Sequence, residues 1–484
     1  MFNRSGVIAV LVALMSGALA AQDASTVISN ASRAIGGDKL KTIEFSGSGA
    51  DFALGQGQNP GPYPRFLNKT YTRAINYETP ATQMTRVRLQ GENPPHGGGN
   101  QPLRGENQQN QTVIVNANTP WGQQLDIWMT PHGFLRAAAA NNNATVKSQT
   151  MGGKTYNVVS FMGQNKAMVN GYINDQNLVE KVETWVDNPM FGDMLVEYLY
   201  GLYKDVDGVK FPTSIVQKQG GFPTLELTVA DVKPNAPADI KPAQGGGGGG
   251  QAPAQRPSEK LAEGIHLIKG AYGSLAVDFK DYIVVIEGPN SEERGLFVIE
   301  EAKRLIPNKP IRYLVNTHTH FDHSSGLRPF VAEGAIVITH EVNRPFLEKV
   351  FSAPHTLNPD ALSRAKKTAR FETMTAKKVL TDGNQVIELH QQQGTGHHPG
   401  IIFAYLPKQK ILMEADGYNA NIPANSPTPN PLGPYAVNLV ENVRRLNLDI
   451  DRIISIHMPP DDRKVTVQEM LKAAGQPGAQ LTSQ

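Results

Sequence analysis

The chain has 484 residues, a length that predicts two domains rather than one. Its composition is that of a globular protein, with 39% hydrophobic and 19% charged residues, and its formal net charge is only +2. This near-neutral balance, without a long basic run, gives no indication of a nucleic-acid partner. The chain contains no cysteine, so disulfides and thiolate ligands are excluded and a metal site must use His, Asp or Glu.

The N-terminus has the layout of a secretory signal peptide. Arg4 precedes an apolar stretch that runs to Met15, and a run of small residues of the A-x-A type ends at Ala20. The apolar stretch is short for a membrane span. We therefore expect residues 1–20 to be removed and the protein to be exported, either to a periplasm or to the medium, with no membrane span. An uncleaved anchor is the alternative.

Residues 22–232 predict a mostly antiparallel β domain. After a short helical stretch around 24–35, segments such as 154–162 alternate apolar and polar residues, which is the pattern of half-buried strands. The polar insert 91–111 predicts a mobile loop, and 130–140 predicts a short helix beside the sheet. No catalytic set of residues is visible in this part, so its role stays open.

Residues 233–260 predict a flexible linker, because their run of glycines flanked by Pro and Ala cannot pack a core. Beyond it, residues 261–475 alternate strands and helices. A helix is expected at 291–305, a buried strand at 311–315 and a last strand at 452–457. Strand–helix alternation of this kind, with hairpins beside it, predicts an α/β sandwich.

Metal-ligand side chains follow the predicted strands of this second domain. The sequence "HTHFDH", residues 318–323, comes just after a predicted strand. His318 and His320 project to the same side of an extended segment, so they can bind one ion. Asp322 and His323 come from the turn that follows and can face a neighbouring ion. Imidazole and carboxylate groups are ligands of borderline metals such as zinc.

Further candidates lie where later strands are expected to end. His397 falls in the Gly-rich turn "GTGHHPG", Asp416 ends the segment 400–416, and His457 ends the last strand. Within the turn we favour His397 over its neighbour as the ligand. Three other residues could support the site or contact substrate: His398, His340 and Tyr418.

The pattern H-x-H-x-D-H, with the later His, Asp and His in this order, resembles the metallo-β-lactamase superfamily over residues 261–475. The resemblance implies an αββα sandwich with two metal ions, Zn²⁺ in the first instance, at the edge of two packed sheets. The implied ligands are His318, His320 and His397 for the first ion, Asp322, His323 and His457 for the second, and Asp416 as the bridge. One departure is Glu287, where the family often has an aspartate.

The resemblance also implies hydrolysis. A water between two zinc-type ions has a lowered pKa and can attack an electrophilic carbonyl or phosphorus. Asp322 would orient this nucleophile and pass a proton to the leaving group. Superfamily members that hydrolyse β-lactams usually have Cys or Ser where this chain has Asp416, so the pattern is closer to the glyoxalase II, lactonase and phosphodiesterase branches. We therefore predict an exported dinuclear hydrolase of a small-molecule ester, lactone, thioester or related bond.

Three alternatives stay open at this point. A β-lactamase would suit the same compartment. A sulfur dioxygenase would use the same scaffold with one Fe²⁺ and a subset of the ligands. A periplasmic ligand-binding protein would use the N-terminal domain to capture a hydrophobic ligand. The substrate, the metal and the oligomeric state are left undetermined by the sequence.

Overall fold

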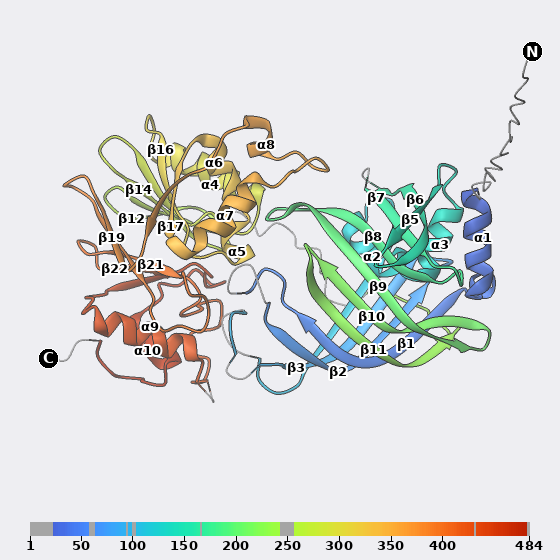
Figure 1. Ribbon diagram of the computed structural model, residues 1–484. Coiled ribbons are helices and arrows are strands. Elements are labelled where there is room, and N and C mark those ends of the chain that lie inside the picture. Colours follow the sequence, from blue (N-terminus) through green and yellow to red (C-terminus); the bar gives the residue numbers. More distant parts are fainter. Residues whose placement is uncertain are drawn as a thin grey trace, which may run out of the picture.

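The computed structural model shows two domains side by side (Figure 1) and describes residues 23–57, 63–92, 95–98, 103–164, 167–242, 256–429 and 432–481. The predicted signal peptide, residues 1–20, lies outside these ranges, as do residues 243–255 of the predicted linker. Among the described residues, no helix is both long enough and apolar enough to cross a membrane.

The N-terminal domain is built on one 11-stranded antiparallel sheet, in the order β4-β3-β2-β1-β11-β10-β9-β8-β7-β6-β5. This confirms the predicted antiparallel character. The first and last strands of the domain pair with each other in the middle of the sheet. The strands are β1 (Thr42–Phe52), β2 (Arg65–Asn76), β3 (Ala81–Gln90), β4 (Asn107–Ile114), β5 (Thr145–Met151), β6 (Lys154–Met162), β7 (Met168–Ile173), β8 (Val179–Asn188), β9 (Gly192–Val206), β10 (Val209–Gln219) and β11 (Phe222–Pro234).

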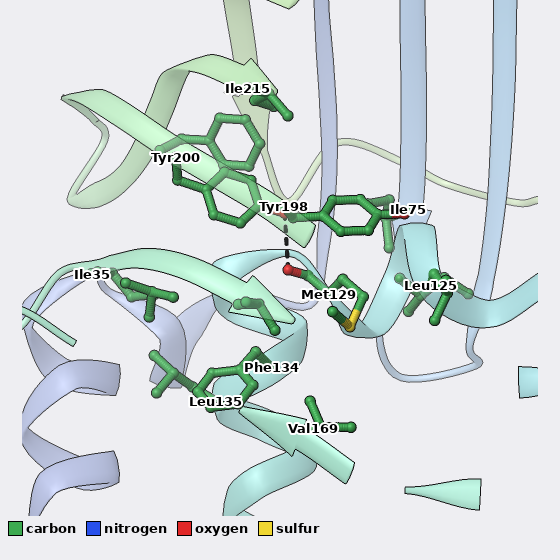
Figure 2. Close-up of a cluster of buried hydrophobic side chains, with 14 of the residues drawn as sticks. Ile35, Ile75, Leu125, Met129, Phe134, Leu135, Val169, Tyr198, Tyr200 and Ile215 are labelled. Carbon is green, nitrogen blue, oxygen red and sulfur yellow. Dashed lines mark hydrogen bonds between the residues drawn. The ribbon is translucent and has the colours of Figure 1, made fainter. Parts of the chain in front are cut away.

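One face of this sheet is covered by α1 (Ala24–Ala34), α2 (Trp121–Trp128) and α3 (Pro131–Ala139), and a short turn of 3₁₀ helix, η1 (Gly37–Lys39), follows α1. Figure 2 shows Phe134 of α3 beside Val169 of β7 in the resulting core. A Cβ atom at Gly171 would lie 2.1 Å from the Phe134 ring, so the missing side chain is what lets the helix pack this closely. Because that face is filled by helices, it forms a solid core.

The prediction of a loop over 91–111 is wrong at its C-terminal end, because β4 begins at Asn107 and pairs with β3. This strand lies at the edge of the sheet, and most of its side chains, such as Gln108 and Asn110, are polar. A strand with polar residues on both faces has no period-two hydrophobic pattern. Only its pairing partner makes it a strand.

The C-terminal domain contains two sheets. The first has seven strands in sequence order: β12 (Glu259–Ala262), β13 (Ile265–Ile268), β14 (Ser274–Asp278), β15 (Ile283–Ile286), β16 (Ile311–Val315), β17 (Ile336–His340) and β18 (Arg370–Met374). The second has five: β19 (Lys377–Thr381), β20 (Val386–Gln391), β21 (Ile402–Leu406), β22 (Ile411–Glu414) and β23 (Arg452–Ser455). Strands β15 to β18 run parallel, and so do β22 and β23.

Buried side chains of both sheets form one cluster, for example Leu275 and Ile338 from the first sheet with Leu389 and Met413 from the second, so the sheets pack face to face. The outer face of the first sheet is covered by α4 (Glu292–Leu305), α6 (Arg328–Glu333), α7 (Arg344–Ser352) and α8 (Ala361–Ala365). The second sheet is covered by α9 (Pro434–Arg445) and α10 (Val467–Ala473). Two short elements remain, α5 (Phe321–Ser324) and the 3₁₀ turn η3 (Glu341–Asn343).

Candidate metal centre

The predicted ligand residues converge where strands of the two sheets end. Strand β16 ends at Val315, an extended stretch carries the first histidines, and α5 carries Asp322 and His323. Strands β22 and β23 run parallel and end near Asp416 and His457. The carboxyl ends of parallel strands meet at one edge, which is where open α/β sheets usually place their ligand sites.

The first group contains His318, His320, His397 and Asp416, each offering one ligand atom within 4.8 Å of the others. The Nε2 atoms of His318 and His397 are 3.3 Å apart, and each lies 3.2 Å from Oδ2 of Asp416. The ring of His320 lies 4.5 Å, centroid to centroid, from both of these histidine rings. Four donor atoms therefore surround one small buried volume.

The second group contains Asp322, His323 and His457, again within 4.8 Å of one another. The two histidine Nε2 atoms are 3.3 Å apart, and each is 3.5 Å from Oδ2 of Asp322. Both also approach Asp416: His323 lies 2.9 Å from Oδ2 and His457 lies 2.9 Å from Oδ1. The Asp416 carboxylate thus stands between the two groups.

The donor set fits a metal ion. His320 is buried, yet within the described part of the chain neither of its ring nitrogens has a hydrogen-bond partner, a costly state for a polar group without a further ligand. Burial, together with neighbouring imidazoles, lowers the pKa of His318 and His320 well below the ordinary value, so both rings are neutral and keep a free lone pair. Imidazole and carboxylate donors without thiolate suit zinc and iron alike.

The carboxylate between the groups is held as an anion. Burial would raise the pKa of Asp416, but the imidazoles of His323 and His457 lower it well below the ordinary value. Burial opposes a charge on His323, but the carboxylates of Asp416 and Asp322 outweigh it and raise its pKa. Asp416 also adopts a φ of 55°, a left-handed conformation that is uncommon for a residue other than glycine. The carboxylates of Asp416 and Asp322 therefore favour positive charge at this place, which a bound cation would supply.

Neighbouring polar groups orient the first histidine. The Thr317 hydroxyl donates to Oε2 of Glu287 over 2.6 Å, so it is left to accept from Nδ1 of His318, 3.2 Å away. Nδ1 therefore carries the proton, and Nε2 presents its lone pair to the site. Asn316 donates its side-chain amide to the backbone carbonyl of His318 over 2.7 Å. Glu287 is fully buried and supports the site in this way rather than as a ligand.

The remaining candidates lie outside both groups. The Gly400 amide donates to Nδ1 of His398, whose Nε2 then donates to the Thr319 hydroxyl over 3.0 Å, so both nitrogens are engaged. Nδ1 of His340 accepts from the Val342 amide and caps η3. Tyr418 packs in the buried cluster under α9 and α10 and is 4% exposed, so it does not contact substrate as the sequence suggested it could.

Sequence reasoning missed three residues that contact the ligands. Gln56, from the N-terminal domain, donates through Nε2 to Oδ1 of Asp322 over 2.9 Å. The Tyr272 hydroxyl donates to the other oxygen, Oδ2, over 3.4 Å, and its ring centroid lies 4.8 Å from that of His457. Burial raises the pKa of Tyr272, which keeps this hydroxyl protonated. The Tyr435 ring lies 5.0 Å from that of His397. No motif could have found them, because each lies far along the chain from the residue that it contacts: Gln56 is 266 positions from Asp322, and Tyr272 is 50 positions from it.

The C-terminal domain thus has two packed sheets between helices and, at their edge, two adjacent His/Asp groups that could hold metal ions and that share the Asp416 carboxylate. The model of the metallo-beta-lactamase superfamily matches residues 275–416, and the C-terminal domain belongs to this superfamily. Membership agrees with the resemblance carried by the histidine motif. The matched segment ends at Asp416 and includes all but one of the predicted ligands.

Solved structures of three proteins illustrate the similarity. A metallo-β-lactamase from Erythrobacter litoralis is 16% identical, with 45% of this chain and 94% of that chain covered and a TM-score of 0.33. A flavodiiron protein from Giardia intestinalis is 15% identical, with 46% and 59% covered and a TM-score of 0.33. A metallo-β-lactamase from Pontibacter korlensis is 15% identical, with 58% and 94% covered and a TM-score of 0.31. A comparison with curated proteins finds no match.

Proposed function

We propose that the protein is an exported dinuclear metal hydrolase that cleaves an ester, lactone, thioester or related bond of a small molecule. One observation carries the proposal: the buried Asp416 carboxylate lies within 3.2 Å of four imidazole nitrogens that belong to two separate groups. In this proposal Asp416 is shared, the rest of the first group holds one ion, and the second group holds the other.

Zinc-type ions bound there would supply a water of lowered pKa and polarise the substrate oxygen. Among the proposed ligands, Asp322 has the most exposed side chain, at 20%. It is therefore the carboxylate that a substrate reaches first. Its Oδ1 is held by Gln56, whereas its Oδ2 accepts only the long bond from Tyr272 and would orient the attacking water and carry its proton to the leaving group.

The kind of bond that we propose is hydrolysed is inferred from the shared carboxylate of Asp416. An aspartate at position 416 gives the site an anionic oxygen ligand, where the superfamily resemblance implies Cys or Ser for members that hydrolyse β-lactams. This favours the branches that hydrolyse thioesters, lactones and phosphodiesters. A β-lactamase is the second candidate within the hydrolase class, and a panel that includes a β-lactam separates the two.

The test is the metal content of the mature protein by elemental mass spectrometry, for the wild type, Asp416→Ala and a control, His266→Ala. His266 is half-buried in β13 and belongs to neither group. We expect about two zinc-type ions per chain in the wild type and the control, and fewer in Asp416→Ala. Esters, lactones, thioesters, phosphodiesters and a β-lactam are then assayed with the loaded protein.

Other outcomes point to the other classes. A content of one iron ion per chain would favour the mononuclear sulfur dioxygenase over the hydrolase as the proposed function. No bound metal after loading would contradict both enzymes and leave the ligand-binding protein.

Export is a separate part of the proposal and rests on residues 1–20. Mass spectrometry of protein expressed from the full sequence in a bacterium with a periplasm tests it. We expect a mature chain that begins at Ala21 in the periplasmic fraction. Retention of residues 1–20 would contradict cleavage.

A further inference from the structure

Two turns of the N-terminal domain reach the metal centre of the other domain. The first, residues 53–57, follows β1, and the second, residues 95–98, lies between β3 and β4. The Gly98 amide donates to the carbonyl of Gln56 over 2.8 Å and ties the turns together. The two turns approach different parts of the site: the first contacts α5, and the second contacts the loop that carries His397.

The first turn contacts α5. The Phe321 amide donates to the Gly55 carbonyl over 3.0 Å, and next to it Gln56 donates to Oδ1 of Asp322 over 2.9 Å. Gly55 has a φ of 81°, and a Cβ atom there would lie 2.3 Å from the Phe321 ring. Only glycine adopts this conformation easily and leaves room for the ring. The turn is therefore shaped to this contact.

The bond from Gln56 determines how Asp322 faces the site. A carboxylate only accepts, so the glutamine must present its amide nitrogen and not its oxygen. With Oδ1 held, rotation of the carboxylate is restricted, and Oδ2 stays 3.5 Å from the Nε2 atoms of His323 and His457. Gln56 thus acts on the second group through Asp322, as outer partners of metal ligands usually do.

The second turn contacts the loop that carries His397. The Gly97 amide donates to the Gly396 carbonyl over 2.9 Å, and the Tyr435 hydroxyl donates to the Gly97 carbonyl over 2.7 Å. The Tyr435 ring packs edge-on against the His397 ring. The N-terminal domain therefore supports a residue of each group.

A third contact also joins the two domains. It is made by the turn between β8 and β9 and by the start of β9, which pack against the C-terminal domain. Met190 has no exposed surface and lies in the buried cluster of the C-terminal domain, and the Phe191 ring lies 5.4 Å from that of Phe321. The Asp193 carboxylate accepts from the amide and the hydroxyl of Thr356, over 2.9 and 2.6 Å. Apolar burial and hydrogen bonds to a charged group together fix the orientation that the two turns need.

We propose that the N-terminal domain is a structural part of the metal centre, with Gln56 as the positioning residue of Asp322. The metal part of this inference rests on the proposed function, whereas the docking of the domains does not. This proposal assigns a role to the N-terminal domain, which the sequence left open. Its two turns support α5 and the loop that carries His397, and the two domains act as one docked unit despite the linker.

The first test compares Gln56→Ala, the isosteric Gln56→Glu and a control, Gln83→Ala, in the full chain. Gln83 is an exposed residue of β3. Zinc affinity is measured by competition with a chromophoric chelator, and the ligand field by the absorption of the Co²⁺-loaded protein. We expect about a tenfold loss of affinity for one of two ions and an altered cobalt spectrum in both Gln56 variants. Gln56→Glu keeps the size of the side chain but replaces the donor with a carboxylate that repels Asp322, so an effect seen in Gln56→Ala alone would indicate lost packing instead.

The second test needs no metal. Hydrogen exchange of the metal-free wild-type chain is measured at the amides of Phe321 and Gly97, which donate across the domain boundary. We expect both to exchange slowly. Fast exchange of both would overturn the docking.

The two proposals fail in different ways. If the wild type binds two ions and both Gln56 variants behave like Gln83→Ala, the positioning role is wrong and the hydrolase proposal stands. If the wild type binds no ion while both amides are protected, the hydrolase proposal is wrong and the docked interface stands.

Discussion

Both domains bury histidine, and the comparison of His132 with His320 separates a structural role from a chemical one. His132 in α3 lies alone against the Phe211 ring, at a centroid distance of 6.1 Å, and its Nε2 is 3.2 Å from the Ile35 carbonyl oxygen. His320 is equally buried but has no hydrogen-bond partner on either nitrogen, and His318 and His397 lie beside it. Burial alone therefore does not indicate function. Convergence of several imidazoles and carboxylates on one buried volume does.

The largest expected effect comes from removing one of the converging donors. His320→Ala should release the first ion and lower hydrolysis by on the order of 10²-fold or more, the usual loss for removing one electrostatic stabiliser. Metal content and turnover measure this. The matched variant His132→Gln should keep its metal. Equal loss of metal in both variants would contradict the assignment of a structural role to His132 and a metal-binding role to His320.

The next effect should appear in the stability of the N-terminal domain and comes from His132. Burial lowers its pKa from 6.5 to about 4, so the unfolded chain binds a proton more readily than the folded one between these values. The stabilisation is present above pH 6.5 and is lost as the pH falls towards 4, by about 3 kcal/mol.

Urea unfolding of the wild type and His132→Gln at several pH values measures this loss. All three tryptophans, Trp121, Trp128 and Trp185, lie in the N-terminal domain, so their fluorescence follows its unfolding. We expect the difference between the two proteins to shrink as the pH falls from 6.5 to 4. A constant difference would show that His132 does not titrate with folding.

The smallest effect concerns Tyr272, which donates to Asp322 over a long 3.4 Å bond. Tyr272→Phe removes a single weak donor and should lower turnover about threefold, within the net value of one hydrogen bond, without changing the unfolding midpoint. Steady-state kinetics measures the turnover, and a thermal melt measures the unfolding midpoint. A loss as large as that of His320→Ala would mean that the hydroxyl takes part in the chemistry.

Much of the C-terminal domain could be predicted because its signals are local. The apolar run Ile311–Val315 predicts β16 at its observed bounds. The spacing of His318 and His320 needs only an extended backbone to bring both to one side. The first part of edge strand β4, residues 107–111, could not be predicted, because polar residues on both faces leave no pattern to detect.

The sequence by itself determined the kind of site, because metal chemistry restricts the ligands to His and Asp in a chain without cysteine, and their order along the strands is visible. The sequence favoured His397 over His398, and the tertiary structure supplies the physical reason: His397 contacts Asp416, whereas His398 is occupied by Thr319 and Gly400. Tertiary structure alone decided that Gln56 reaches Asp322, since a contact between two domains depends on how their surfaces dock and leaves no local signal.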